Sequence, residues 1–139
     1  MLLGRDDISP DEPDGSGRTQ LSWAAERGWG GIVKILLRLD GVNPNRQNAH
    51  GETPLSYAVF CGHEGVVKIL LGPDDVNPDE ADESGRTQLS WAAEFGWEGV
   101  VKVLLERDDV NPDKPDKLGR TPLWYASQYG RAGVVALLR

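Results

Sequence analysis

The sequence is poor in the residues that enzymes most often use at catalytic and metal sites. Its 139 residues include one cysteine, Cys61, and two histidines, His50 and His63. A lone cysteine forms no internal disulfide, which suits a reducing compartment and predicts a cytoplasmic location. No further His or Cys completes a zinc site around Cys61 and His63, and nothing near them is placed to orient a Cys–His nucleophile. We therefore expect no enzyme activity, no metal and no cofactor.

Positive charge and long apolar runs are also scarce. The chain has 15 Lys and Arg residues against 22 Asp and Glu residues, for a net charge of −7. This balance disfavours nonspecific binding to nucleic acid or to anionic membranes. No apolar run approaches the roughly 18 residues of a membrane-spanning helix. We therefore expect neither nucleic acid nor a membrane as the partner.

The sequence is instead rich in internal repetition. Glycines recur every 34 residues at positions 17, 51, 85 and 119, and most other conspicuous residues keep this spacing. A repeat of this length buries its apolar face only by stacking on further copies, so the pattern predicts a solenoid. The predicted units are a leading tail (1–16), repeats one to three (17–50, 51–84 and 85–118) and a shortened repeat four (119–139). Because the outer units are incomplete, we expect a segment of a longer array.

Each unit predicts two short helices and an extended loop, here called the finger. In repeat three, Thr87 is placed to cap the first helix, and apolar residues at helical spacing follow in 89–93. Gly96 is expected to end this helix in the left-handed conformation that glycine adopts at little cost. The run 100–105 predicts the second helix. The polar stretch 108–119 contains two prolines, which exclude a helix and favour an extended finger.

The motifs of the repeat resemble those of the ankyrin repeat family. Gly-x-Thr-Pro-Leu-x-x-Ala occurs at 51–58 and 119–126, and Ala-Ala-x-x-Gly occurs at 24–28 and 92–96. Val-Val-x-x-Leu-Leu occurs at 66–71 and 100–105. A 34-residue period also matches tetratricopeptide repeats, but those need two longer helices and leave no room for a proline-containing finger.

The resemblance implies an all-α, right-handed stack of helix–turn–helix–finger units with little or no regular strand. It also implies that partners touch the finger tips and the ends of the first helices. The sequence of the repeat is similar to that of ankyrin arrays in filamentous fungi. Those arrays often form the C-terminal sensor of NLR-like, NACHT-containing proteins. One departure is that the family's turn-bracing histidine is replaced in every repeat, by Ser22, Ser56, Ser90 and Trp124.

The two residues before each helix-ending glycine vary most among the repeats. They are Glu26, Arg27, Phe60, Cys61, Glu94, Phe95, Gln128 and Tyr129. Aromatic residues with charged neighbours on an exposed stripe suit a protein-binding hot spot. The alternative is that Phe60, Phe95 and Tyr129 pack under the fingers of their own repeats.

The residue after each opening glycine forms a second candidate row, made of Arg18, Glu52, Arg86 and Arg120. Arginines in such a row suit bidentate binding of acidic partners. The alternative, which we favour, is that each pairs with a nearby acidic finger residue such as Glu83 or Asp116.

Two aromatic positions are expected to be structural. One position of the first helix is always aromatic: Trp23, Tyr57, Trp91 and Tyr125. We expect an aromatic ladder between repeats there, rather than a stacking platform for a ligand. Packing between repeats is also expected for Trp29, His63 and Trp97 at the turn between the helices, with Arg131 as the exception. The finger 109–113 opens like an EF-hand calcium loop. It lacks the glycine at position six that makes the turn and the glutamate ligand at position twelve, so we expect a solvated acidic loop.

The function predicted from these features is protein–protein recognition through the concave face. The rival is a spacer or scaffold array that positions other domains, and exposure of the stripe formed by Phe60, Phe95 and Tyr129 distinguishes the two. The apolar last helix, 134–138, has no polar capping repeat. We therefore also expect end-to-end self-association.

Overall fold

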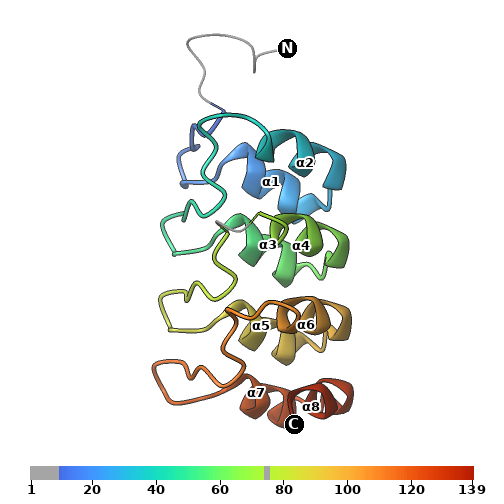
Figure 1. The fold of residues 1–139 in the computed structure, drawn as a ribbon. Helices are drawn as coiled ribbons and strands as arrows, with labels where there is room; N and C mark the ends of the chain where they lie inside the picture. The colour runs from blue at the N-terminus through green and yellow to red at the C-terminus, as the bar shows by residue number, and fades with distance from the viewer. Residues whose placement is uncertain (1–9, 74–75) are drawn as a thin grey trace.

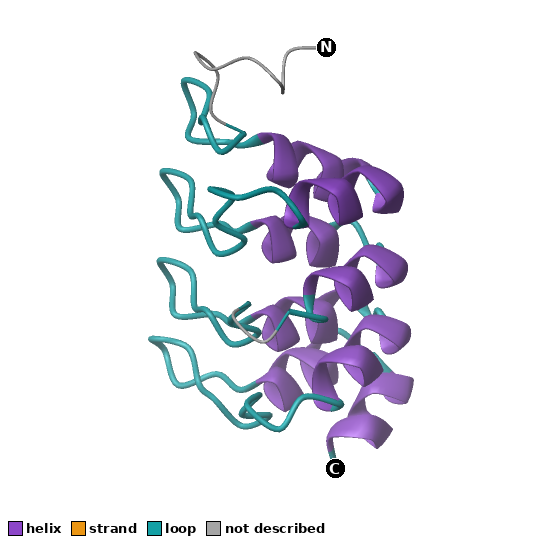
Figure 2. Ribbon diagram, turned by 45° about the horizontal axis from the view of Figure 1, so that its top comes forward, coloured by secondary structure: helices purple, strands orange, loops and turns teal. Residues whose placement is uncertain are grey.

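The computed structural model describes residues 10–73 and 76–139, which form a stack of helix pairs (Figure 1). The helices of the described residues are α1 (Gln20–Arg27), α2 (Gly30–Leu37), α3 (Pro54–Phe60), α4 (Glu64–Leu70), α5 (Gln88–Phe95), α6 (Glu98–Leu105), α7 (Pro122–Gln128) and α8 (Ala132–Leu138). None of the described residues belongs to a strand (Figure 2). The predicted all-α solenoid is confirmed. The first nine residues of the predicted leading tail, 1–16, lie outside the described residues.

The stack consists of two layers of helices and one row of fingers. The first helices (α1, α3, α5 and α7) contact one another in one layer, and the second helices (α2, α4, α6 and α8) contact one another in the other. The fingers project on the side of the first helices, on the left in Figure 1. The finger tips and the first helices therefore share one side of the molecule.

A threonine begins each first helix, as predicted for Thr87. Thr19, Thr53, Thr87 and Thr121 have extended backbones, and each side chain accepts the backbone N–H three residues later. Ser22 and Ser56 reciprocate, because each hydroxyl accepts the backbone N–H of its capping threonine at 2.9 and 3.1 Å. These serines therefore complete capping boxes at two helix starts.

Small residues allow the repeats to approach closely. The alanines of the first helices are at most 1% exposed: Ala24, Ala25, Ala58, Ala92, Ala93 and Ala126. In the second helices, Val33, Val67 and Val101 are completely buried. Helices of seven or eight residues are not stable alone in water, so burial between repeats holds them in place.

The turn between the two helices of a repeat packs on the glycine that follows the first helix of the preceding repeat. A Cβ at Gly28 would lie 2.9 Å from the ring of His63, and one at Gly62 would lie 2.9 Å from the ring of Trp97. His63 Nε2 also lies 2.8 Å from the backbone oxygen of Glu26. The predicted packing of His63 and Trp97 between repeats is confirmed.

Arg131 fills the same place in repeat four and is therefore not the exception that we expected. A Cβ at Gly96 would lie 2.8 Å from Arg131 Cδ, and Arg131 Nε donates to the backbone oxygen of Glu94 at 2.8 Å. Gly96 has the left-handed φ of +76°. Both its conformation and its neighbour exclude a side chain.

Replacing Gly96 with Val should lower the free energy of unfolding by about 1–3 kcal/mol, because a β-branched residue is strained at positive φ. Urea unfolding of the two proteins measures this difference. Gly65→Ala in α4 is the control, since a Cβ there meets no atom within 4 Å and alanine favours the helix. Equal unfolding free energies for wild type and Gly96→Val would contradict the assignment.

Candidate functional site

Each finger tip is folded around one Asp or Asn side chain at a repeating position: Asp14, Asn48, Asp82 and Asp116. In the finger before α5, Asp82 Oδ1 accepts the backbone N–H groups of Ser84 at 2.9 Å and Arg86 at 3.0 Å. Asp82 Oδ2 accepts the indole N–H of Trp91 in α5 at 2.9 Å. Equivalent bonds join the fingers before α1 and α7 to the helices that follow. The aromatic residues Trp23, Trp91 and Tyr125 therefore fix these fingers to the first helices.

These hydrogen bonds keep the finger aspartates ionised. Burial raises the pKa of Asp82, but hydrogen bonds from Ser84, Trp91 and Arg86 outweigh burial and hold the pKa below its usual value. For Asp14, the backbone N–H of Arg18 is the largest cause, and the pKa is lowered to about 2. Each of these two finger tips therefore carries a fixed negative charge.

Arginines lie between the aromatic rings of neighbouring repeats. Arg86 Cζ lies 3.6 Å from the ring centroid of Trp91 in α5 and 3.6 Å from that of Tyr125 in α7. Arg18 lies in the same way between rings of α1 and α3, at 3.6 and 4.3 Å. The expected ladder of direct ring contacts is therefore corrected. It is an alternation of rings and guanidinium groups held by cation–π attraction.

Arg18 and Arg86 are also paired, though not with the finger residues that we expected. Arg18 Nη2 lies 2.7 Å from Glu26 Oε1, and Arg86 Nη1 lies 2.8 Å from Glu94 Oε1. The expected pairing with an acidic finger is wrong for both arginines. Arg86 joins neighbouring repeats through its contacts with Trp91 and Tyr125. Because Arg86 is 7% exposed, it does not form an open clamp for an acidic partner.

Arg120 behaves differently from the other two arginines. Its Cζ lies 4.7 Å from the ring centroid of Trp124. Burial raises the pKa of Asp116, but hydrogen bonds, the first from Tyr125, and the charge of Arg120 outweigh burial and lower it. The backbone N–H of Arg120 donates to Asp116 Oδ1 at 2.8 Å, but no side-chain ion pair joins the two residues in the described part of the chain. Pairing of the Arg120 guanidinium with an acidic finger residue therefore stays a prediction.

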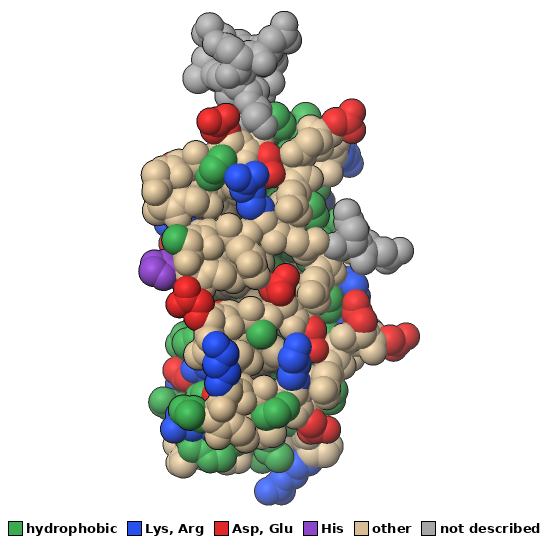
Figure 3. Space-filling model, turned by 90° about the vertical axis from the view of Figure 1, so that its left-hand side faces the viewer, with side chains coloured by type: hydrophobic (Ala, Val, Ile, Leu, Met, Phe, Trp, Pro, Cys, Tyr) green, Lys and Arg blue, Asp and Glu red, His purple; other side chains and the backbone are tan. Residues whose placement is uncertain are grey.

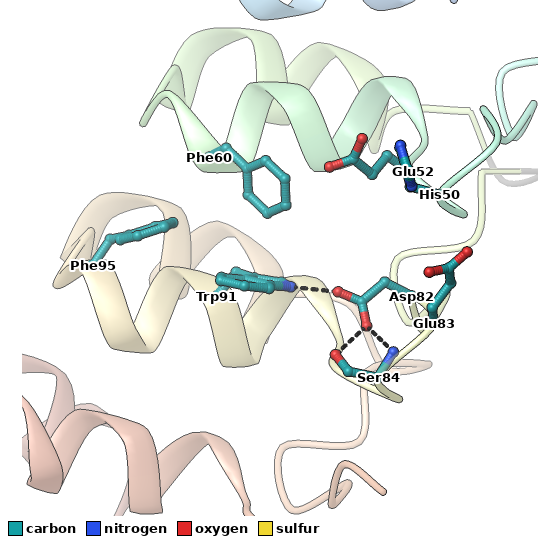
Figure 4. Close-up of a pocket in the computed structure, with 8 residues that line it drawn as sticks. All are labelled: His50, Glu52, Phe60, Asp82, Glu83, Ser84, Trp91 and Phe95. Atoms are coloured by element: carbon teal, nitrogen blue, oxygen red, sulfur yellow. Dashed lines mark hydrogen bonds between the residues drawn. The ribbon is translucent and has the colours of Figure 1, made fainter. Parts of the chain in front are cut away.

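The interface between repeats two and three departs from this pattern. Glu52 holds the position of Arg18 and Arg86, and Phe60 holds the position of their carboxylate partners. A groove of about 470 Å³ opens at this level, between α3, α5 and the fingers before them (Figure 4). The groove is lined by His50, Glu52, Phe60, Asp82, Glu83, Ser84, Trp91 and Phe95.

One end of the groove is aromatic. Phe60 from α3 lies edge-on to Trp91 from α5, with ring centroids 5.1 Å apart. Phe95 stacks beside Trp91 at 5.8 Å and lies 6.3 Å from Phe60. All three side chains are half-buried, so the cluster offers part of its surface to a ligand.

The other end of the groove is acidic, with Glu52, Asp82 and Glu83 lying away from Phe95 (Figure 4). Asn48 Nδ2 donates to Glu52 Oε1 at 2.8 Å, and Glu83 is exposed. Within the part of the chain that the structure describes, no Lys or Arg lies within salt-bridge distance of these three carboxylates.

The structure divides the predicted binding residues into three groups. Glu52, Phe60 and Phe95 line the groove. Arg18 and Arg86 form ion pairs with Glu26 and Glu94 of their own repeats, and Arg120 lies over Trp124. The others are exposed outside the groove: Arg27, Cys61, Gln128 and Tyr129.

Cys61 follows α3 and is exposed. Partial burial by surrounding residues, together with the charge of Glu26, raises the pKa of its thiol. A raised pKa reduces the thiolate fraction, which is the opposite of what a catalytic cysteine needs.

Sequence reasoning missed part of the groove. We assigned Trp91 to packing between repeats and gave no role to Asp82 or Ser84, which lie in a finger and reach the groove only through the fold. The available signal was a paired exchange within repeat two. Glu52 replaces an arginine and Phe60 replaces its glutamate eight residues later.

Comparison with family models decides the classification. The model for ankyrin repeats (3 copies) matches residues 1–82 and 66–139. The chain belongs to the ankyrin repeat family. No curated protein sequence matches it. Ankyrin repeats are in general protein–protein interaction modules.

No helix among the described residues is long and apolar enough to cross a membrane. Nor does that part of the chain bring together three or more His, Cys, Asp or Glu side chains that could hold a metal ion.

In this ankyrin chain, the finger aspartates should make stability depend on acid pH. A carboxyl group with a lowered folded pKa stabilises the fold above its usual pKa of 3.8, and that contribution is lost as the pH falls through the folded value, about 2 for Asp14. We expect Asp82→Asn/Asp116→Asn to be less stable than wild type at neutral pH and to lose less stability between about pH 4 and about pH 2. Urea unfolding across this range measures both effects.

Asp113→Asn provides the control for that experiment, because the Asp113 side chain is exposed and accepts no hydrogen bond among the described residues. Its acid dependence should equal that of the wild type. Identical acid dependence in the double variant would show that the finger hydrogen bonds do not carry the effect.

Proposed function

We propose that this ankyrin segment recognises a protein partner through its finger side, with the groove between repeats two and three at the centre of the contact. The observation that carries this proposal is the half-exposed aromatic cluster of Phe60, Trp91 and Phe95 in that groove. Aromatic side chains in a partly desolvated pocket are typical of binding hot spots.

Further aromatic surface is exposed in repeat four. Tyr129 is 52% exposed and Trp124 is 38% exposed. In Figure 3, which faces the fingers, hydrophobic side chains gather toward the C-terminal end, while charges of both signs are spread along the stack. A partner that spans the groove and this end would cover an apolar centre with a charged rim, as interfaces commonly do.

Rigidity also favours recognition. The finger before α5 is held by the hydrogen bonds of Asp82 to its own backbone and to Trp91. A surface that is already ordered loses little entropy when it binds. A spacer array needs no exposed aromatic groove, so the groove favours recognition over the spacer function.

We also infer, from the resemblance to fungal ankyrin arrays, that this segment is the cytoplasmic sensor region of an NLR-like receptor.

Replacing Phe95 or Tyr129 with Ala should weaken capture of the partner about tenfold, because each change removes an aromatic contact. The immobilised protein is exposed to an extract of its source cells, and retained proteins are quantified by mass spectrometry. Lys102→Ala, on the exposed side of α6, is the matched control and should retain the partner like wild type. A partner retained equally by all four baits would place the contact elsewhere, and the absence of any retained protein would favour the spacer.

We also infer that copies of this chain stack end to end. Ile32 in α2 is 47% exposed, whereas its equivalents Val66, Val100 and Val134 are at most 4% exposed because a preceding repeat covers them. At the other end, α7 and α8 border a groove of about 410 Å³. The exposed side of α2 corresponds to the side that a preceding repeat covers inside the stack, and the groove beside α7 and α8 corresponds to the side that a following repeat covers. The two ends are therefore complementary, so that copies of the chain can stack head to tail.

Ile32→Lys should suppress this association, because it places a charge in the apolar contact. Sedimentation velocity over increasing protein concentration should show growing assemblies for wild type and a monomer for the variant. A wild type that stays monomeric at the highest concentration would contradict the inference.

A further inference from the structure

The groove coincides with an interruption of the arginine column. In the two flanking interfaces, the guanidinium groups of Arg18 and Arg86 lie between aromatic rings of successive repeats. In the interface between repeats two and three, the equivalent residue is Glu52, and it lines the groove together with Trp91. This is the interface in which the chain supplies no arginine of its own at that position.

The groove combines an aromatic ring of the column that contacts arginines elsewhere, Trp91, with carboxylates from other positions, Glu52, Asp82 and Glu83. Arg86 contacts both Trp91 and Tyr125 of repeat four, so it lies on the side of Trp91 that faces repeat four. The opposite side of Trp91 faces Phe60 and the groove. An aromatic face beside carboxylates is the environment in which cation–π attraction and ion pairing act together.

We propose that the groove binds an arginine side chain of the protein partner. The guanidinium lies against Trp91 and Phe60 and pairs with the carboxylates of Glu52, Asp82 and Glu83. This inference rests on the proposed function and names the chemistry of the partner at that site. A guanidinium bound there lies on the side of Trp91 opposite Arg86.

Charge selects this occupant over other side chains. A partner carboxylate would approach three negative charges that lack a Lys or Arg partner among the described residues, which is strongly unfavourable. An apolar side chain would desolvate Glu52 and Asp82 without a compensating bond. Arginine is favoured over lysine because its planar group both stacks on rings and binds carboxylates through paired N–H groups.

A short peptide tests the proposal directly. The probe is a capped nonapeptide of alternating Gly and Ser with one central arginine, and its match is the same peptide with citrulline, which is neutral and nearly isosteric. Binding is followed through the indole N–H resonance of Trp91 in ¹⁵N-labelled protein. We expect the arginine peptide to bind about tenfold more tightly than the citrulline peptide.

Variants locate the binding in the groove. Glu52→Gln should weaken the arginine peptide about tenfold, because it removes one carboxylate from the site. Glu106→Gln is the matched control, since it makes the same change of charge at an exposed residue outside the groove. Its affinity should stay within about twofold of wild type, as expected when distant charges are screened by salt.

The double variant Glu52→Arg/Phe60→Glu gives repeat two the arginine and glutamate of repeats one and three. Its own guanidinium should then occupy the groove, so peptide binding should disappear while the melting temperature stays equal to that of wild type or rises. Loss of binding in this variant is therefore not attributable to unfolding.

Three results would overturn the proposal. The first is equal affinity for the arginine and citrulline peptides, and the second is unchanged binding of the arginine peptide by the double variant. The third is no shift of the Trp91 indole resonance at about 10 mM peptide, because weaker binding is too weak to matter in a cell. The proposed function fails separately, when Phe95→Ala and Tyr129→Ala leave capture of the cellular partner unchanged. A partner that still depends on Phe95 while the peptide does not bind would leave recognition intact and exclude arginine as its anchor.

Discussion

The structure depends on the burial of one repeat against the next. Each helix has seven or eight residues, which is too short for stability in water. Neighbouring repeats bury alanines such as Ala58 and Ala92 completely. The positions that repeat most strictly are therefore those where a larger side chain would separate the layers, including Gly96, over which Arg131 lies.

The same contacts orient the finger side of the molecule. Trp91 donates to Asp82 in the finger and stacks on Arg86, which reaches Tyr125 in the next repeat. One aromatic side chain thus fixes its finger to its helix and its repeat to the following one. A change in stacking would therefore move the finger as well, so the position of the finger depends on the stacking of the repeats.

The sequence was sufficient for the fold because the decisive signals are local and repeated. Thr87 caps its helix through the backbone N–H three residues later, and Gly96 adopts its positive φ by its own chemistry. The site was harder to predict, since its contacts join separate segments of one repeat or cross to the next repeat. Glu94 lies eight residues from Arg86, and Tyr125 lies in another repeat. Periodicity placed the arginines and the aromatic residues in separate columns but did not show that these columns interdigitate.

The proposed binding groove lies where one repeat differs from the others. A repeat two built like repeats one and three would hold an arginine and a glutamate in a largely buried pair, as Arg86 and Glu94 do with side chains 9% and 17% exposed. Glu52 and Phe60 remove that pair and leave rings and carboxylates at the surface. Local departures from the rules that stabilise a fold are expected at functional sites. In this chain, the departure and the groove lie at the same two residues.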